Sequence, residues 1–264
     1  MSDCIVETTG GVMLIRFNRP ERLNAMGGTM LQEMGEALDA GQKDDSVRAF
    51  VVTGEGRAWC SGADLAAMGG PRPANAPGPR ATAVDRAGFA GEMVMKLQHC
   101  DKPTIAAVNG VAVGGGLGLV TSFDIRIASE QARFSTIFIK RALAPDFALS
   151  WFLPRLVGPE HAAELFFSGR MVSAQEAKEI GLVSKVVPHD QLLEVAMEQA
   201  SAIAKQPPTA VTLTRRALQR AQTNSLEEHL EFEWANQKTC LASAEFKEGV
   251  AAFMEKREPD YSRF

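Results

Sequence analysis

Apolar residues near the N-terminus alternate with polar ones or form short runs, which predicts strands. Ile5–Thr8 is followed by the glycine pair Gly10–Gly11 and then by Val12–Phe17. Two strand-like segments joined through such a pair are typical of a β-hairpin. Farther along, Ala49–Thr53 is a short apolar run ended by glycines, and it predicts a buried strand.

Helical spacing appears between and after these strands. Apolar or small residues recur three or four positions apart at Met30, Met34, Ala37, Leu38 and Gly41. This period predicts an amphipathic helix. Similar spacing predicts further helices over Asp85–Cys100, Gln191–Lys205, Thr209–Gln222, Leu226–Leu241 and Glu245–Lys256.

Two more apolar runs, Thr104–Val108 and Asp124–Ala128, predict strands in the middle of the chain. Strands followed by helices, with a helical tail, indicate an α/β fold. We expect a core over residues 1–190 and a helical C-terminal region over 191–264. Residues 69–82 hold four prolines and three glycines, so a surface loop is expected there, either a lid near a substrate or a plain insertion.

Composition excludes several classes of protein. The formal net charge of the 264 residues is −4, which argues against a nucleic-acid binder that relies on positive charge. No run approaches the ~20 apolar residues of a membrane span. The N-terminal residues lack a basic start followed by an apolar stretch. A soluble, cytoplasmic protein without a membrane partner is therefore expected.

Cysteine and histidine positions give no sign of a metal centre. The four cysteines are far apart, which favours free thiols over a disulfide framework or a zinc site. No histidine pair has ligand spacing, so no metal site is predicted. No serine lies in a G-x-S-x-G pattern, and a hydrolytic triad is not expected.

Glycine-rich segments carry the main chemical signal. Trp59–Leu65 follows a predicted strand, and Val108–Gly118 holds a run of glycines after another. Backbone N–H groups at the start of a helix have no partner within that helix. Glycine lets a ligand approach them closely, and two such amides at one point would stabilise an oxyanion. Ordinary turn glycines are the alternative, whereas the dinucleotide and phosphate-loop patterns both fail.

The same segments resemble a known family. Arg19–Met26, Cys60–Leu65, Lys102–Gly116 and Gly169–Val187 are similar, in this order, to motifs of the enoyl-CoA hydratase/isomerase (crotonase) family. The resemblance implies a spiral core of ββα units, a helical C-terminal region and a homotrimer or hexamer, the hexamer being a dimer of trimers. It also implies an acyl-CoA thioester substrate. Coenzyme A would enter as part of that substrate, and no cofactor would be bound permanently.

The resemblance also implies roles for individual residues. It assigns the two amides of the oxyanion hole to Ala63 and Gly115. It implies contacts with coenzyme A at Arg22, Leu23, Ala25, Ala63, Asp64, Leu65, Gly114 and Gly115. Phe253 and Lys256 match an aromatic residue and a lysine that reach the nucleotide end of coenzyme A in relatives. A helix face with one core Phe and one solvated Lys is the alternative for this pair.

The carboxylates of a hydratase are missing from the matching positions. The resemblance places the two glutamates of hydratases at residues that are Gly118 and Phe138 here. Neither side chain can carry a proton, which argues against the usual hydration mechanism. Asp124 matches an aspartate that is common in the family whatever the reaction, and a structural role is expected for it.

Asp146 is the remaining candidate acid or base. It stands in an apolar stretch that contains Phe147, Trp151 and Phe152, and such surroundings raise the pKa of a carboxyl group. A helix N-cap is the alternative, since Asp146 precedes an apolar helical run. The resemblance favours catalysis, because isomerases and an aromatic acyl-CoA dehalogenase of the family have a catalytic aspartate here.

The sequence thus predicts an enzyme that shifts a double bond of an enoyl-CoA. Ala63 and Gly115 would stabilise the enolate, and Asp146 would move the proton. Three alternatives stay open: a hydratase with an atypical site, dehalogenase-like or hydrolytic chemistry on an aromatic acyl-CoA with Asp146 as nucleophile, and a non-catalytic acyl-CoA-binding homologue. The dehalogenase-like alternative needs an aromatic pocket, for which the candidates are Phe134, Phe138, Phe147, Trp151 and Phe152.

Overall fold

The larger of two β-sheets forms the base of the molecule. The computed structural model describes residues 2–64 and 85–264. The sheet has the strand order β1-β2-β3-β5-β7-β10, with β1 and β2 antiparallel and the other neighbours parallel. Its strands are β1 (Cys4–Thr9), β2 (Val12–Phe17), β3 (Ala49–Gly54), β5 (Thr104–Val108), β7 (Ile125–Ser129) and β10 (Lys185–Val187).

A smaller sheet has the order β4-β6-β8-β9. Its strands are β4 (Ala58–Cys60), β6 (Val111–Val113), β8 (Arg133–Ser135) and β9 (Val172–Ser173). The pairs β3 and β4, β5 and β6, and β7 and β8 each send their first strand to the large sheet and their second to the small one. Helices α4 (Gly88–His99) and α5 (Gly115–Thr121) follow β4 and β6. This is a spiral of strand–strand–helix units, and the predicted α/β class is confirmed.

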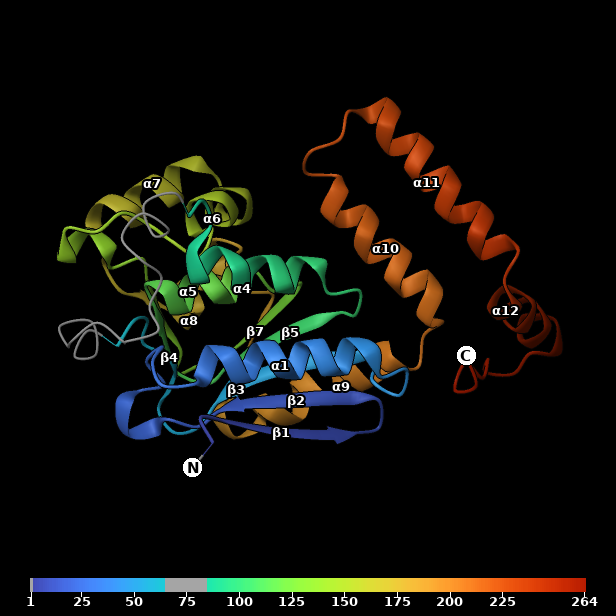
Figure 1. Ribbon diagram of the computed structural model, residues 1–264, viewed down its shortest axis with the longest axis horizontal. Helices are drawn as coiled ribbons and strands as arrows, with labels where there is room; N and C mark the ends of the chain where they lie inside the picture. The colour runs from blue at the N-terminus through green and yellow to red at the C-terminus, as the bar shows by residue number, and fades with distance from the viewer. Residues whose placement is uncertain (1, 65–84) are drawn as a thin grey trace.

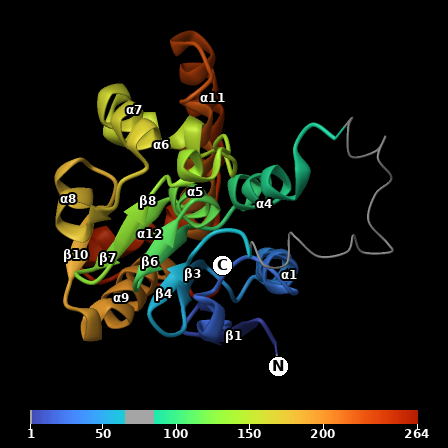
Figure 2. The same cartoon turned by 90° about the vertical axis from the view of Figure 1, so that its left-hand side faces the viewer.

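Alternate side chains of the strands serve two faces of the large sheet. Met13 and Ile15 pack with α1 (Met30–Lys43), whereas Val12 and Leu14 pack with α9 (Leu192–Ala204). Figures 1 and 2 show the strands lying between these two helices. The predicted hairpin and both helices are confirmed, with ends that differ by a residue or two.

Shorter helices lie between β8 and α9 in the chain. They are η2 (Phe138–Arg141), α6 (Leu149–Val157), α7 (Pro159–Ser168), α8 (Ala174–Glu179) and η3 (His189–Gln191). A further short helix, η1 (Pro20–Arg22), follows β2. Figure 2 places α5, α6 and α7 together on the side of the small sheet. Residues 69–82, predicted to form a loop, lie outside the described residues.

The last three helices stand apart from the sheets. They are α10 (Pro208–Arg220), α11 (Leu226–Leu241) and α12 (Ala244–Glu255), and Figure 1 shows them as an arm beside the core. Arg215 of α10 joins the arm to the core: its Nε donates to Asp124 Oδ2 at 2.8 Å and its Nη2 to the Leu97 carbonyl at 2.8 Å. Asp124 also accepts from the Thr104 amide at 2.8 Å. These contacts give Asp124 the structural place that was expected for it.

Candidate active site

A mostly apolar cavity of about 500 Å³ lies where the start of α5 meets the end of β4. This volume is in the range of small-molecule sites. The cavity brings together Ala63, Gly114, Gly115 and Asp146, which are distant in the sequence. Its remaining walls come from the start of α1, from Phe89 of α4 and from residues 137–147, including Met26, Leu31, Ile137, Phe138, Leu143 and Phe147.

Ala63 and Gly115, which both line this cavity, belong to adjoining segments. A Cβ atom built on Gly62 would lie 3.6 Å from the Gly115 amide nitrogen, so the two segments are in contact. The Met26 amide donates to Gly62 O at 2.7 Å and the Asp64 amide donates to Met26 O at 3.1 Å. The Ala63 amide takes no part in this pairing. Gly115 is the first residue of α5, where an amide has no partner within the helix. Within residues 2–64 and 85–264, neither amide has a protein acceptor.

Close contact between backbones explains the glycine at position 116. A Cβ there would lie 2.9 Å from the Cys60 carbonyl carbon and closer still to its oxygen. Real Cβ atoms do not approach backbone so closely, and the packed interior leaves no space for either segment to move. Glycine at this position is therefore what lets α5 begin beside the end of β4.

Asp146 enters the cavity from a turn before α6. Helix α6 begins at Leu149, its N-cap is Ala148, and the cap makes no side-chain hydrogen bond. The alternative that Asp146 is the N-cap is therefore wrong. The residue as a whole is exposed to solvent, yet partial burial of its carboxyl group against the cavity walls raises the pKa of Asp146 above its usual value.

The positions of the hydratase glutamates are apolar in the structure as well. A Cβ at Gly118 would lie 2.6 Å from Phe147 Cβ, so the turn that carries Asp146 leaves no space for a side chain there. Phe138 is buried and lines the cavity. Apart from Asp146, no carboxylate lines this cavity in the part of the chain that the structure describes.

Of the aromatic residues considered for a pocket, only Phe138 and Phe147 line this one. Phe134 is fully buried in the core, and Trp151 and Phe152 line a separate groove between α4, α6 and α10. The sequence reasoning missed Phe89, whose ring meets Phe147 edge to face at 5.8 Å. No local pattern marks Phe89, because the contact joins two segments that are distant in the sequence.

The segment predicted to contact coenzyme A lies beside the cavity. Arg22 ends η1 and is exposed, Leu23 follows it with a φ of 54°, and Ala25 is buried. The Arg19 guanidinium donates to the Ala25 carbonyl at 2.5 Å and to Asp64 Oδ2 at 3.3 Å. Arg19 thereby ties this segment to the strand end that carries Ala63. Leu65 lies outside the described residues.

Phe253 and Lys256 are not brought to the cavity within one chain. Phe253 belongs to α12 and Lys256 follows it, and Figure 1 shows α12 far from α5 and α6. The side chain of Phe253 is 80% exposed, so the alternative of a core phenylalanine is wrong. Lys256 is exposed as that alternative expected.

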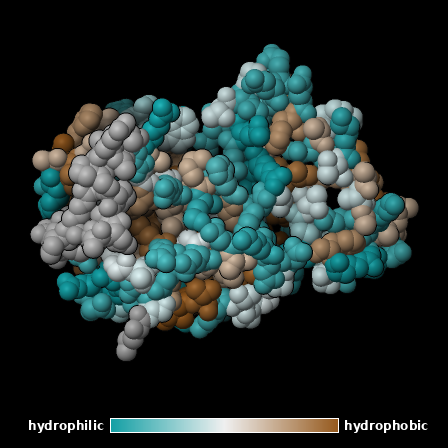
Figure 3. Space-filling model, viewed as in Figure 1, coloured by the Kyte–Doolittle hydropathy of each residue, from teal (hydrophilic) through white to brown (hydrophobic). Residues whose placement is uncertain are grey.

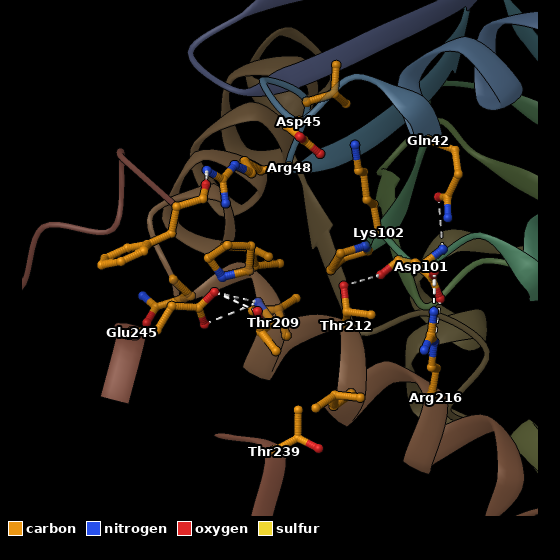
Figure 4. A pocket seen from close by; sticks show the side chains of 18 residues that line it. Gln42, Asp45, Arg48, Asp101, Lys102, Thr209, Thr212, Arg216, Thr239 and Glu245 are labelled. Atoms are coloured by element: carbon orange, nitrogen blue, oxygen red, sulfur yellow. Dashed lines mark hydrogen bonds and ion pairs between the residues drawn. The ribbon is translucent and has the colours of Figure 1, made fainter. Parts of the chain in front are cut away.

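A second cavity, of about 450 Å³, lies between the core and the arm (Figure 4). Several of its charged groups already have partners. Asp101 pairs with Arg216 at 2.5 Å, Lys102 Nζ donates to the carbonyls of Gly41 and Asp44 at 2.6 Å each, and Glu245 accepts from Thr209 Oγ1 at 2.7 Å. The Asp101–Arg216 pair joins the arm to the core, and these contacts leave the cavity of Asp146 as the stronger candidate site.

Neither a metal cluster nor a membrane-spanning helix among the described residues competes with this site. Residues 2–64 and 85–264 contain no group of three or more His, Cys, Asp or Glu side chains placed to hold a metal ion. No helix in the same ranges has the length and apolar character needed to cross a membrane.

Comparisons with known proteins cover almost the whole chain. The family model described as enoyl-CoA hydratase/isomerase matches residues 7–263. The chain is 37% identical over 255 residues to the 1,2-epoxyphenylacetyl-CoA isomerase of Escherichia coli strain K12, covering 96% of this chain and 95% of that protein. It is 35% identical over 260 residues to the short-chain-enoyl-CoA hydratase of Clostridium acetobutylicum, covering 98% and 97%. The crystal structure of an enoyl-CoA hydratase from Bacillus anthracis superposes with a TM-score of 0.90 at 33% identity, covering 99% of each chain.

Proposed function

This chain belongs to the enoyl-CoA hydratase/isomerase family, and we propose that within it the protein shifts a carbon–carbon double bond of an enoyl-CoA. The family membership and the crotonase-like fold, both predicted from the sequence, are confirmed. The observation that carries the finer proposal is that Asp146, the one carboxylate among the described residues that line the cavity, shares this cavity with Ala63 and Gly115.

In the proposed mechanism the thioester carbonyl oxygen accepts hydrogen bonds from the N–H groups of Ala63 and Gly115. The Asp146 carboxylate takes a proton from the carbon between the carbonyl and the double bond. The C–H bonding pair becomes part of a dienolate, whose negative charge the two amides stabilise. Asp146 then returns the proton to the far end of the former double bond. No water is consumed, and the product is the conjugated isomer.

Hydration is the second candidate, because a relative at 35% identity is named a short-chain-enoyl-CoA hydratase. Adding water requires groups that hold and activate it beside the substrate. The structure has Gly118 beneath a backbone turn and Phe138 in the cavity wall, and neither residue can do this. These two positions favour the double-bond shift over hydration.

The experiment that tests the proposal offers the purified protein a 3-enoyl-CoA and, separately, a 2-enoyl-CoA. We expect the 3-enoyl-CoA to be converted to its conjugated 2-isomer, followed by the absorbance of the conjugated thioester and by mass spectrometry. Formation of 3-hydroxyacyl-CoA would instead establish hydration. Binding of both thioesters without turnover would favour a non-catalytic homologue. Loss of a ring substituent or of coenzyme A from an aromatic acyl-CoA would point to Asp146 as a nucleophile.

We also propose that coenzyme A lies along two segments of the chain. One holds Arg22, Leu23 and Ala25, and the other holds Ala63, Asp64 and Leu65. Gly114 and Gly115 would lie at the thioester. Phe253 and Lys256 would contact the nucleotide end of a coenzyme A held by a neighbouring subunit. The support for this arrangement is that α12 lies far from the cavity of its own chain (Figure 1), while Phe253 is 80% exposed.

A homotrimer, alone or paired into a hexamer, would also cover the apolar surface of the arm. Leu226, Leu230 and Trp234 of α11 are 70%, 54% and 58% exposed and are spaced to share a helix face. Apolar residues are visible in Figure 3 among polar ones where Figure 1 places α10 to α12. Exposed apolar surface of this kind marks an interface between proteins.

Replacing Trp234 with glutamate is expected to break this assembly, because the interface would then bury an unpaired charge. Light scattering after size-exclusion chromatography should show a trimer or hexamer for the wild type and a smaller species for Trp234→Glu. Ala235→Glu adds the same charge at an exposed position on another face of α11 and should leave the mass unchanged. A monomeric wild type would exclude the proposed assembly.

A further inference from the structure

The turn that carries Asp146 has an unusual backbone. Phe147 and Ala148 have φ angles of 48° and 52°, and the Leu149 amide donates to the Asp146 carbonyl at 3.0 Å. Positive φ at both central residues is the pattern of a type I′ turn, which glycine and asparagine favour. A residue with a Cβ costs about 1–2 kcal/mol in this conformation. Contacts with the rest of the protein must therefore hold the turn in place.

Helix α5 supplies such contacts. A Cβ at Gly118 would lie 2.6 Å from Phe147 Cβ and 3.2 Å from the carbonyl oxygens of Asp146 and Phe147. A Cβ at Gly115 would lie 3.0 Å from Cδ2 and Cε2 of the Phe147 ring. Phe147 thus rests with its ring on the first residue of α5 and with its backbone on the next turn of the same helix.

Phe89 of α4 packs against the same ring. The ring centroids of Phe89 and Phe147 are 5.8 Å apart at an interplanar angle of 73°, an edge-to-face pair. Phe147 is only 3% exposed. Its ring is therefore confined by α5 and α4, and the backbone that follows Asp146 is confined with it.

We infer that Phe147 is a positioning residue for the reaction: by packing on Gly115 and Gly118, it fixes the Asp146 carboxylate relative to the Gly115 amide. The inference rests on the proposed function, in which these two groups act on one substrate at the same time. A misplacement of about 1 Å between reacting groups can reduce a rate about 10²-fold. Because Phe147 directly follows Asp146 in the chain, movement of Phe147 against α5 would also move the base.

Replacing Phe147 with alanine is the direct test. We expect kcat to fall by about 10- to 100-fold with little change in KM, because the base is displaced while the coenzyme A contacts remain. Phe147 also lines the cavity in which partial burial raises the pKa of Asp146, and a smaller side chain would admit water there. The fall of kcat/KM on the acid side of the pH profile should therefore occur at a lower pH in Phe147→Ala than in the wild type. Phe147→Leu restores much of the lost bulk and should recover part of both effects.

A double-mutant cycle tests the contact with α5 itself. Gly118→Ala introduces a Cβ that collides with Phe147 Cβ, so it should also lower kcat. Phe147→Gly removes the colliding atom, and the double variant Gly118→Ala/Phe147→Gly should lose less than the sum of the two single losses. Strictly additive losses would show that the two residues act independently, and they would overturn the inference.

Ala148→Gly is the matched control, since Ala148 shares the positive φ of the turn but carries no ring. Its kcat and pH profile should match those of the wild type, and circular dichroism should show that every variant is folded. Full activity of an Asp146→Asn variant would refute the proposed function. An inactive Asp146→Asn variant beside a Phe147→Ala variant with wild-type kcat and an unmoved fall on the acid side of the pH profile would refute the positioning role alone.

Discussion

Replacing Asp146 with asparagine is expected to lower kcat for the proposed double-bond shift by about 10²- to 10⁴-fold, the usual contribution of a positioned acid or base. Asparagine has nearly the same shape as aspartate but cannot accept the proton. Asp146 is also the only carboxylate among the described residues that line the cavity, so no neighbour there can replace it. The affinity for an acyl-CoA, measured by calorimetry on the same preparation, should change little.

The pH dependence of the wild type provides an independent check. As the proposed base, Asp146 works only when ionised, so kcat/KM should fall as the pH is lowered through the pKa of Asp146. Partial burial raises this pKa, and the fall should begin at a higher pH than an exposed aspartate would give. The residual activity of Asp146→Asn should lack this fall. Asp190→Asn, an exposed change in η3, should leave rate and profile unaltered. A wild-type rate for Asp146→Asn would exclude Asp146 as the base.

Replacing Gly116 with alanine is expected to damage both folding and catalysis. The new Cβ would lie 2.9 Å from the Cys60 carbonyl carbon and closer to its oxygen, and backbone atoms cannot rotate away as a flexible side chain would. Overpacking of this kind costs about 1–3 kcal/mol or more of unfolding free energy. Separation of β4 from α5 would also pull the Ala63 amide away from the Gly115 amide. Loss of one oxyanion donor costs about 10²- to 10³-fold in kcat.

Denaturant unfolding and steady-state kinetics on the folded fraction would separate these two effects. Gly35→Ala in α1 is the matched control, because the atoms nearest to a Cβ there belong to the side chains of Lys96 and Met93, at 3.4 Å. In a helix interior alanine is favoured over glycine by about 0.5–1 kcal/mol, so this variant should be as stable as the wild type or more so. A Gly116→Ala protein with wild-type stability and rate would mean that the two segments are not packed as described.

Much of the fold could be predicted because its signals are local. The glycine pair at Gly10–Gly11 and the alternation around it are sufficient for the β1–β2 hairpin. Helices α10 to α12 follow the spacing of apolar residues, and their observed ends differ by one or two residues at most from those expected. The strands of the small sheet are only two or three residues long, too short for a periodic pattern, and the sequence did not indicate them separately.

Some features of the candidate site could likewise be predicted from the local sequence, and others could not. Gly118 and Phe138 showed from the sequence that two carboxylates are missing, because this depends only on which residue stands at each position. Whether Asp146 would cap α6 or enter a cavity depended on the backbone of the next two residues, Phe147 and Ala148. Their positive φ angles go against the intrinsic preference of both residue types. A local pattern therefore could not have predicted them.

By itself, the sequence determined the α/β class, the family, the glycine segments that bear the two amides and the absence of the hydratase glutamates. Each of these depends on residue identity within a short stretch of chain. Only the tertiary structure decided that Asp146 shares a cavity with Ala63 and Gly115, that Phe89 packs on Phe147, and that Phe253 lies far from this cavity. Contacts of this kind join distant segments, and they depend on how α4, α5 and the turn before α6 pack together.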